Sequence, residues 1–445
     1  MSAVSTAGAE LELTEKQRRV AEAVTEDRGH LLVTGRAGTG KSTLLEHIVA
    51  SSSRRVAVCA PTGVAALNVG GQTIHSLFKL PIGLIGPAPL VQDRALQRLL
   101  SAIDVLIIDE VSMVSADLLD AVDRSLRLAR ARQEPFGGVQ VVLFGDPYQL
   151  APVPGSAEER AYYTDVYRSM WFFDAKVWEE TELGIVELDL IHRQRDEEFR
   201  SLLTAVRHGR VTAEMAARLN GMGARPVPAD PPLTLASRND TVAAINAAAL
   251  ARLPGKEALS LAEVEGDFGG RAYPADEELR LKVGAHVMML RNDADGRWVN
   301  GSMGVVSRMR QFHLSVEIDG VEHDVDPVSW ERHRYAYSPG SKELKREVVA
   351  EFRQLPVRLG WAVTIHKSQG KTFDAARIDL GRKAFSPGQT YVALSRLTSL
   401  EGLYLTRPLV PGDVIVDADV RRWMGERRAA ARAAAEASAA GVAPA

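Results

Sequence analysis

Short apolar runs alternate with helix-like stretches along most of the chain. The runs at 30–35, 54–61, 105–110 and 139–146 each end in glycine, proline or an acidic residue. Apolar runs of this length are typical of strands that are buried on both faces of a parallel sheet. Because strands that alternate with helices form parallel sheets, this part of the chain predicts an α/β domain.

The first domain is expected at 13–185, after a small-residue tail at 1–12. It should begin with a helix at 13–24, for which Thr14 is the expected N-cap. The segment KLPIGLIGPAPL is rich in proline and glycine and cannot form a regular helix, which indicates a small insertion at 77–100.

A second alternating set begins near Glu187, so a second α/β domain is expected at 186–410. HVMML (286–290) is predicted to be one of its strands. Residues 306–355 differ, because apolar and polar positions alternate there around an Asp-Gly pair. This pattern predicts antiparallel hairpins, and we expect a small inserted β-barrel. A C-terminal helix and a disordered tail are expected at 411–445, since the alanine-rich end has no apolar face.

The composition is that of an ordinary globular protein with two to four domains. Hydrophobic residues make up 46% and charged residues 25% of the 445 residues. A single cysteine, Cys59, excludes an intrachain disulfide and is consistent with a cytoplasmic location. No apolar run approaches the length of a membrane span, so no membrane partner is expected. The net charge of −3 counts against a chain covered by nucleic acid but allows a local basic channel.

GRAGTGKS (35–42) lies between a predicted strand and a predicted helix, which is the setting that a P-loop requires. Its glycines let backbone N–H groups turn toward phosphate oxygens. Lys41 can reach the β- and γ-phosphates of ATP, and the hydroxyl of Ser42 can hold Mg²⁺. The expected nucleotide-binding residues of this loop are Gly35, Gly38, Thr39, Gly40, Lys41, Ser42 and Thr43.

Two carboxylates, Asp109 and Glu110, end the buried run at 105–110. Asp109 would hold Mg²⁺, and Glu110 would orient or deprotonate the attacking water. Alone, such a pair caps the next helix about as often as it acts in a site. After a P-loop, and on a second strand of the same sheet, the pair favours nucleotide hydrolysis.

Three further residues can complete a hydrolytic site. Gln149, in GDPYQLAPV (145–153), can contact both the γ-phosphate and the water. A cation at the γ-phosphate contributes roughly 10³–10⁵ in rate, and Arg193 and Arg396 are the candidates for that role. Because both arginines fall in the second half, ATP would lie between the two domains. For either arginine alone, a surface salt bridge is the more common role.

Three segments, 60–68, 71–78 and 364–373, mix hydroxyls, histidine, lysine and small residues just after predicted strands. Hydroxyls suit the phosphate oxygens of a nucleic acid, and rings can lie against its bases or sugars. The candidate DNA contacts are Thr62, His75, Phe78, Thr364, His366, Lys367 and Ser368.

The ordered set of motifs resembles the superfamily 1B DNA helicases, specifically the Pif-type (petite integration frequency) family, relatives of the RecD subunit. The resemblance runs from residue 13 to about 405. The matching strings include GRAGTGKS, APTGVAA, GQTIHSLF, IIDEVSMVS, PFGGVQVVLFGDPYQLAPV, HRQ, TIHKSQGKTFD and YVALSRLTSLEGLYL. Among them, VSMVS, PFGG and TIHKSQG are quite specific to that family.

The resemblance implies an α/β fold of two RecA-like parallel-sheet P-loop domains. The insertion at 77–100 would be a wedge subdomain, and 306–355 would be an SH3-like subdomain. Gln17 would contact adenine. The implied activity is ATP-dependent and Mg²⁺-dependent movement, 5′→3′, along single-stranded DNA, with unwinding of forked duplex by a monomer during replication, repair or recombination.

Three alternatives remain open at this point. A P-loop ATPase that does not move on DNA explains 35–42 and 109–110, but it gives no reason for TIHKSQG or VALSR in the second half. An inactive relative that clamps DNA is disfavoured, because all the hydrolytic positions are present. A RecD-like motor subunit of a larger complex would require a partner chain.

Overall fold

The computed structural model describes residues 13–439, except 82, 87–89, 153–156, 191–195, 230, 267–272, 311–312 and 339–342. The tail expected at 1–12 and the last residues, 440–445, therefore lie outside the described residues. Within the described part of the chain, every helix is too short or too polar to span a lipid bilayer.

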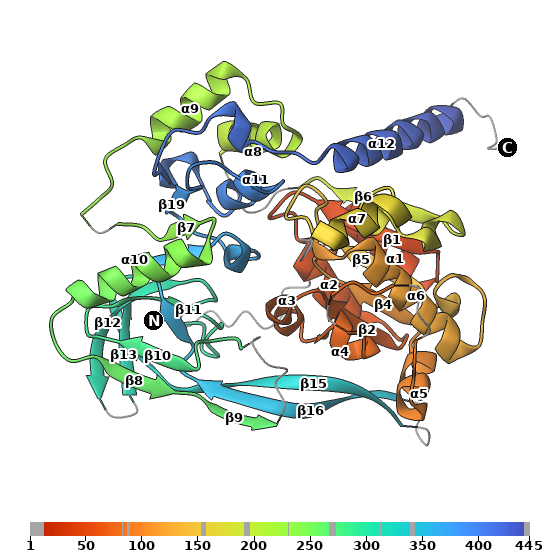
Figure 1. The fold of residues 1–445 in the computed structure, drawn as a ribbon, viewed down its shortest axis with the longest axis horizontal. Coiled ribbons are helices and arrows are strands. Elements are labelled where there is room, and N and C mark those ends of the chain that lie inside the picture. The colour runs from red at the N-terminus through yellow and green to blue at the C-terminus, as the bar shows by residue number, and fades with distance from the viewer. Residues whose placement is uncertain are drawn as a thin grey trace.

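The first lobe is built on a six-stranded parallel sheet of order β3-β2-β4-β5-β1-β6 (Figure 1). Its strands are β1 (His30–Gly35), β2 (Val56–Ala60), β3 (Gln72–Thr73), β4 (Val105–Ile108), β5 (Gln140–Phe144) and β6 (Leu183–Leu188). The four strands predicted in this lobe are confirmed within one or two residues. All four residues of β4 and all five of β5 are buried, as their uninterrupted apolar runs require.

Helices cover both faces of this sheet. They are α1 (Glu15–Thr25), α2 (Lys41–Ser51), α3 (Gly63–Asn68), α4 (Ile74–Phe78), α5 (Arg94–Ala102), α6 (Ala116–Arg130) and α7 (Ala157–Val166). Thr14 is the N-cap of α1, as predicted, and forms a capping box with Gln17. Thr14 N–H donates to Gln17 Oε1 at 2.9 Å, which fixes the direction of the Gln17 side chain.

The expected boundary between the domains at 185/186 is wrong. It divides β6, which pairs in parallel with β1 as far as Leu188 and so completes the first sheet. Strand β6 has only two buried residues, because it lies at the edge of the sheet. Its mixture of apolar and polar residues therefore differed from the apolar runs of the other strands and was interpreted as the start of the second domain.

The second lobe has a smaller parallel sheet of order β18-β7-β19-β20. Its strands are β7 (Thr234–Ala236), β18 (Ala362–Thr364), β19 (Ala376–Asp379) and β20 (Leu403–Leu405). Its helices are α8 (Glu197–His208), α9 (Ala213–Gly223), α10 (Asn239–Arg252) and α11 (Gln389–Leu394). The prediction of two parallel α/β domains is thus confirmed.

The all-β insertion is larger than predicted. Its strands are β8 (Ala258–Leu261), β9 (Glu263–Gly266), β10 (Glu278–Leu281), β11 (His286–Met289), β12 (Met303–Arg310), β13 (His313–Ile318), β14 (Val321–Val325), β15 (Val328–Ser338), β16 (Glu343–Gln354) and β17 (Val357–Leu359). They form sheets of order β14-β13-β12-β11-β17, β15-β16-β9 and β10-β8. The predicted Asp-Gly hairpin is present, with φ of 51° at Asp319 and 78° at Gly320.

The assignment of 286–290 to the second parallel sheet is wrong, and so is the expected start of the insertion at 306. Strand β11 pairs antiparallel with both β12 and β17. A short apolar run has the same appearance in either kind of sheet, so its partners could not be read from its own residues. The insertion therefore spans 258–359.

Two long strands, β15 and β16, leave the insertion as a ribbon that runs along the base of the molecule to α5 (Figure 1). The ribbon also contacts α4, since Arg332 Nη2 donates to Ser76 Oγ at 3.0 Å. The predicted insertion at 77–100 begins at the end of α4. Among its described residues, the regular structure after α4 is the helix α5.

The C-terminal helix α12 (Ala418–Ala439) crosses from the second lobe to the first (Figure 1). The Trp423 ring stacks on Phe173 with 4.5 Å between centroids, and Arg428 pairs with Glu187 at 2.8 Å. The C-terminal helix expected within 411–445 is present and extends as far as Ala439. The anchoring apolar residues Val420, Trp423 and Met424 precede the alanine-rich stretch, so its own pattern did not show the docking.

Truncating the anchor of α12 should destabilise the protein. Trp423→Ala removes a ring that is 8% exposed, and it should lower the free energy of unfolding by about 3 kcal/mol. The measurement is denaturant unfolding, with the exposed Arg432→Ala as the matched control on the same helix. Equal stabilities of the two variants would contradict the docking of α12.

Candidate nucleotide site between the lobes

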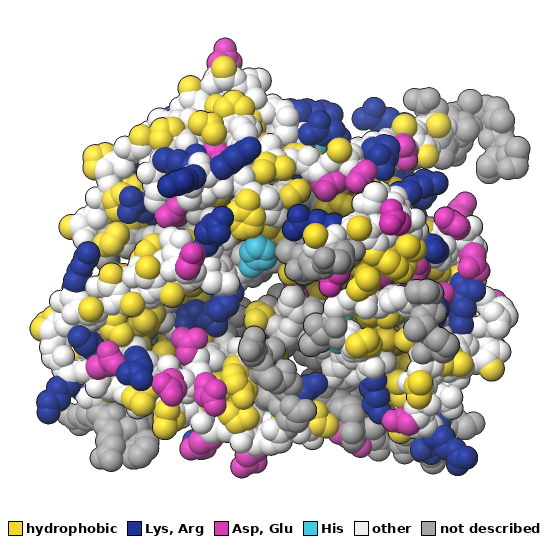
Figure 2. Space-filling model, viewed as in Figure 1, with side chains coloured by type: hydrophobic (Ala, Val, Ile, Leu, Met, Phe, Trp, Pro, Cys, Tyr) yellow, Lys and Arg dark blue, Asp and Glu magenta, His cyan; other side chains and the backbone are white. Residues whose placement is uncertain are grey.

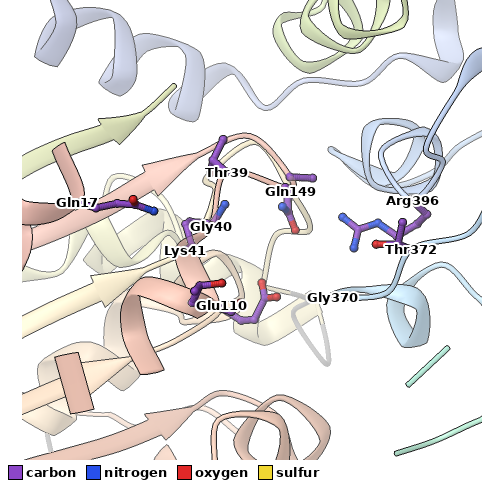
Figure 3. Close-up of a pocket in the computed structure, with 13 residues that line it drawn as sticks. Gln17, Thr39, Gly40, Lys41, Glu110, Gln149, Gly370, Thr372 and Arg396 are labelled. Carbon is purple, nitrogen blue, oxygen red and sulfur yellow. The ribbon is translucent and has the colours of Figure 1, made fainter. Parts of the chain in front are cut away.

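A cavity of about 660 Å³ lies between the two lobes, at the carboxyl end of β1. Figure 3 shows the first lobe supplying one wall and the second lobe supplying the wall opposite. The first lobe contributes Gln17, Ala37, Gly38, Thr39, Gly40, Lys41, Ser42, Thr43, Glu110 and Gln149. The second lobe contributes Gly370, Thr372 and Arg396.

The loop between β1 and α2 has the backbone that its glycines allow. Gly38 and Gly40 have φ of 79° and 78°, in the left-handed region. A Cβ at Gly35 would lie 2.6 Å from the carbonyl oxygen of Leu188, so a side chain there would collide with β6. Helix α2 begins at Lys41 without a side-chain N-cap, which leaves its first N–H groups available to an anion.

The side chain of Lys41 folds back onto the P-loop. Its Nζ donates to the carbonyl oxygens of Gly35 at 2.8 Å and Arg36 at 3.0 Å. Burial lowers the pKa of Lys41, while Asp146 and Glu110 oppose that shift. An anionic ligand in the cavity would offer this cation a stronger partner than two neutral carbonyl groups.

Asp109 and Glu110 follow the end of β4. Glu110 has φ of 50°, an uncommon backbone for a residue other than glycine, and such strain is concentrated at functional sites. Burial, together with repulsion from Glu110, raises the pKa of Asp109 to about 7. Burial also raises the pKa of Glu110, although Lys41 and Arg396 oppose this. Two adjacent, half-buried carboxylates favour a bound cation.

The donor set fits Mg²⁺. Ser42 offers a hydroxyl oxygen at the cavity wall. Asp109 offers a carboxylate just after the end of β4, which is separated from β1 by β5. No group of three or more His, Cys, Asp or Glu side chains is placed to hold a metal within the described part of the chain. Few protein ligands are typical of Mg²⁺, which is commonly bound through one or two carboxylates, water and substrate phosphates.

Arg396 and Gln149 face each other across the cavity (Figure 3). Arg396 is 2% exposed, and its guanidinium donates to Val392 O at 3.1 Å and Ser395 Oγ at 2.9 Å. Gln369 Nε2 donates to Gln149 Oε1 at 3.4 Å, which joins the two lobes beside the cavity. The other candidate, Arg193, lies outside the described residues.

A buried ion pair between the lobes was not anticipated from the sequence. Asp146 and Arg207 are 0% and 1% exposed and lie 2.8 Å apart. The Tyr391 hydroxyl donates to Asp146 Oδ2 at 3.1 Å and accepts from the P-loop N–H of Ala37 at 3.3 Å. Burial acts to raise the pKa of Asp146, but Arg207 holds it below its ordinary value. Asp146 belongs to the GDPYQL string, so the sequence marked it as a candidate functional residue. Arg207 lies in a helix that contains no recognisable motif.

Four of the candidate DNA contacts follow strand ends in the two lobes, and a fifth, Thr364, is the last residue of β18 and is only 6% exposed. In the first lobe, Thr62 caps α3, and His75 is half-buried on α4, where burial lowers its pKa. In the second lobe, Thr364 Oγ1 accepts from Lys367 N–H at 3.2 Å, and burial lowers the pKa of His366. Lys367 is exposed.

The other two candidates are corrected by the structure. Phe78 is 2% exposed and packs in the core of the first lobe, because its helical position on α4 points inward with Ile74 and Leu77. Ser368 is 0% exposed, and its hydroxyl donates to Ile365 O at 2.7 Å. The predicted side-chain contacts of Phe78 and Ser368 with DNA are therefore wrong in this structure.

The fold and the site define a P-loop protein with two RecA-like lobes. A family model described as PIF1-like helicase matches residues 12–217, and a model of the Pif1 DNA helicase 2B domain matches residues 272–309. The chain belongs to the PIF1-like helicase family.

Relatives match the chain over most of its length. ATP-dependent DNA helicase PIF1 of Mus musculus is 37% identical over 411 residues, which is 88% of this chain and 59% of that protein. ATP-dependent DNA helicase Pif1 of Bdellovibrio bacteriovorus is 33% identical, over 92% of this chain and 91% of that protein. The chain thus spans about 60% of the length of the mouse and human relatives.

Solved structures of Bacteroides sp Pif1 share the fold. The complex with ADP-AlF4 has a TM-score of 0.88 at 35% identity, covering 94% of this chain and 98% of that one. The unliganded form has a TM-score of 0.87, and the form bound to single-stranded DNA has 0.70. Over the whole chain, the structure is therefore more similar to the two forms without DNA than to the form bound to single-stranded DNA.

Removing the Asp109 charge should stabilise the protein in the absence of nucleotide, and more so at high pH. The Asp109 pKa is raised from 3.8 to about 7, so the folded state holds a proton that the unfolded state has lost. Stability attributable to this group therefore falls as pH rises through that window. We expect Asp109→Asn to raise the melting temperature at pH 8, by ~2–4 °C for each kcal/mol gained.

The same variant should gain less at pH 5, where Asp109 is still protonated in the folded protein. The measurement is thermal melting at both pH values, with the exposed Asp319→Asn as control. An equal gain at pH 5 and pH 8 would show that Asp109 is not a strained buried acid.

Proposed function

We propose that this chain is an ATP-dependent DNA helicase that moves 5′→3′ along single-stranded DNA and separates duplex, in DNA replication, repair or recombination. The observation that carries the proposal is the cavity between the lobes, with Lys41 and the P-loop on one wall and Arg396 on the other. Because such a ligand contacts both lobes, its binding favours closure of the lobes, and its release lets them open.

The proposed chemistry is hydrolysis of ATP. Gln17 contacts adenine, and Lys41 holds the β- and γ-phosphates. When bound, Mg²⁺ neutralises phosphate charge, and Ser42 and Asp109 hold it. The other first-lobe residues of the loop, Gly35, Gly38, Thr39, Gly40 and Thr43, shape the phosphate cradle.

The attack on the γ-phosphate needs groups from both lobes. Glu110, already near Lys41 and of raised pKa, takes the proton of the attacking water. Gln149 contacts the γ-phosphate and that water, and Arg396 stabilises the charge that develops on the phosphate. Arg193 is proposed as a second cation at the same place. An arginine in this role contributes roughly 10³–10⁵ in rate.

Single-stranded DNA is the proposed track. Thr62 and His75 in the first lobe, and Thr364, His366 and Lys367 in the second, form two contact areas that move relative to each other as the lobes open and close. Structures of Bacteroides Pif1 bound to single-stranded DNA and at forked double-stranded DNA support this choice of partner.

The single buried Cys59 supports a cytoplasmic location as part of the proposal, and action as a monomer stays a prediction. A RecD-like subunit of a larger complex, or an ATPase clamp that does not unwind, remain the rival functions. DNA-stimulated ATPase activity without strand separation would favour the clamp.

Strand separation on tailed duplexes tests the proposal directly. The substrates share one duplex and carry a single-stranded tail at the 5′ end, at the 3′ end or at neither. We expect separation of the 5′-tailed duplex when ATP and Mg²⁺ are present, because entry must precede movement toward the 3′ end. Separation that starts from the 3′ tail, or that proceeds without ATP, would refute the proposed motor.

Glu110→Gln should separate nucleotide binding from turnover. The amide keeps the size of the side chain but cannot accept a proton, so we expect ATPase activity to fall by roughly 10²–10⁴-fold. ATP affinity should stay within a few-fold, measured by titration of a fluorescent ATP analogue. The exposed Glu134→Gln serves as the control. If Glu110→Gln hydrolysed ATP at a rate near that of the control, another group would have to accept the proton of the attacking water.

A further inference from the structure

A second cavity, of about 690 Å³, lies on the second lobe, away from the nucleotide site. It forms where the chain leaves the carboxyl ends of β7 and β19. Its lining residues are Arg238, Asp240, Leu380, Arg382, Lys383, Ala384, Phe385 and Ile415. None of these residues belongs to the machinery proposed above.

The cavity carries a surplus of positive charge. Three lining residues, Arg238, Arg382 and Lys383, are exposed cations, and no ion pair of theirs is found among the described residues. The lining has one acid, Asp240, whose Oδ1 accepts from the N–H of Thr241 at 2.7 Å. Figure 2 shows Lys and Arg side chains gathered over the part of the second lobe that holds β19 and α11. Such a lining favours an anionic ligand.

An exposed aromatic ring lies beside these cations. Phe385 is 55% exposed, and the Arg238 guanidinium lies over its ring, 5.2 Å from the centroid. An exposed ring among cations is the combination by which proteins hold single-stranded nucleic acid, since the base stacks and the phosphate pairs.

The register of the sheet places this cavity next to the proposed DNA track. Thr364 of β18 pairs with Ala236 of β7, and Ala236 pairs with Asp379 of β19. The loops that follow these three strands therefore leave the same edge of the sheet, side by side. Since adjacent strands are ~4.8 Å apart, the two strands whose loops line the cavity, β7 and β19, lie roughly 5 and 10 Å from β18, which leads into the segment with His366 and Lys367.

We propose that the cavity lined by Arg238, Arg382, Lys383 and Phe385 extends the track and holds one base and the neighbouring phosphates of the same single strand. This inference rests on the proposed function. Continuity with the 364–368 segment favours a polymer over a free nucleotide, and the cavity has no glycine-rich loop to cradle a polyphosphate.

The test compares two double variants that remove the same charges from the same lobe. R382A/K383A alters the cavity, whereas R252A/K256A removes an exposed arginine and lysine near the other end of α10. Binding of a fluorescent oligothymidylate is measured by anisotropy over a range of salt concentrations. Each lost phosphate contact lowers the slope of log K against log salt by about 0.7, so R382A/K383A should lose about 1.4.

Two further variants separate charge from stacking. R382K/K383R keeps both cations and should keep the slope of the starting protein. F385A should keep the slope but weaken binding by roughly 5- to 140-fold, the loss expected for one stacked base. ATPase activity without DNA should be unchanged in R382A/K383A.

The results distinguish a failure of the proposed DNA contact at this cavity from a failure of the proposed function. If the starting protein binds the oligothymidylate and R382A/K383A has the slope of R252A/K256A, the cavity is not part of the track and this inference is overturned. Binding by F385A at the level of the starting protein would overturn the stacking role in the same way. If the starting protein itself fails to bind the oligothymidylate, the proposed function fails first.

Discussion

Asp146 and Arg207 form an ion pair of 2.8 Å at the contact between the lobes, where neither side chain is exposed to solvent. Burying two charges is costly unless further hydrogen bonds satisfy them. Here Arg207 Nε contacts both carboxylate oxygens, and Tyr391 donates to one of them. Loss of one partner would leave an unpaired buried charge, at a cost of about 3–5 kcal/mol. Through Tyr391 and the N–H of Ala37, this pair ties the P-loop to the second lobe.

The nucleotide cavity follows from that constraint, because its two walls belong to different lobes. With the walls held together, Lys41, Glu110 and Arg396 line one cavity, and Asp109 lies next to Glu110 in the chain. Burial disfavours charge on Lys41, Asp109 and Glu110, and the raised pKa of Asp109 is one expression of this. A ligand with negative phosphates and a divalent cation would offer partners to both kinds of charge: the phosphates to Lys41, and the cation to Asp109 and Glu110. The charges already present are those that a metal–nucleotide complex would neutralise, which supports the proposed site.

What the sequence could predict was local. GRAGTGKS has glycines where φ is positive and a lysine at the start of a helix, and both properties belong to the string itself. What it could not predict depends on partners distant in the chain. The strand at 286–289 pairs with strands of the insertion, and Arg207 gains its meaning from Asp146, 61 residues away. Phe78 was a candidate because its segment mixes hydroxyls and a histidine just after a predicted strand, but on α4 its side chain is buried together with Ile74 and Leu77.

The buried position of Ser368 indicates how the two proposed sites communicate. Its carbonyl oxygen, like that of Lys371, accepts from Arg396 Nη1 at 3.4 Å. The same short segment carries Thr364 and His366 toward the proposed track and Gly370 and Thr372 into the nucleotide cavity. A movement of Arg396 toward a γ-phosphate would lengthen or break these two hydrogen bonds. The backbone carbonyl of Ser368 thus contacts Arg396, while its hydroxyl closes the turn with Ile365.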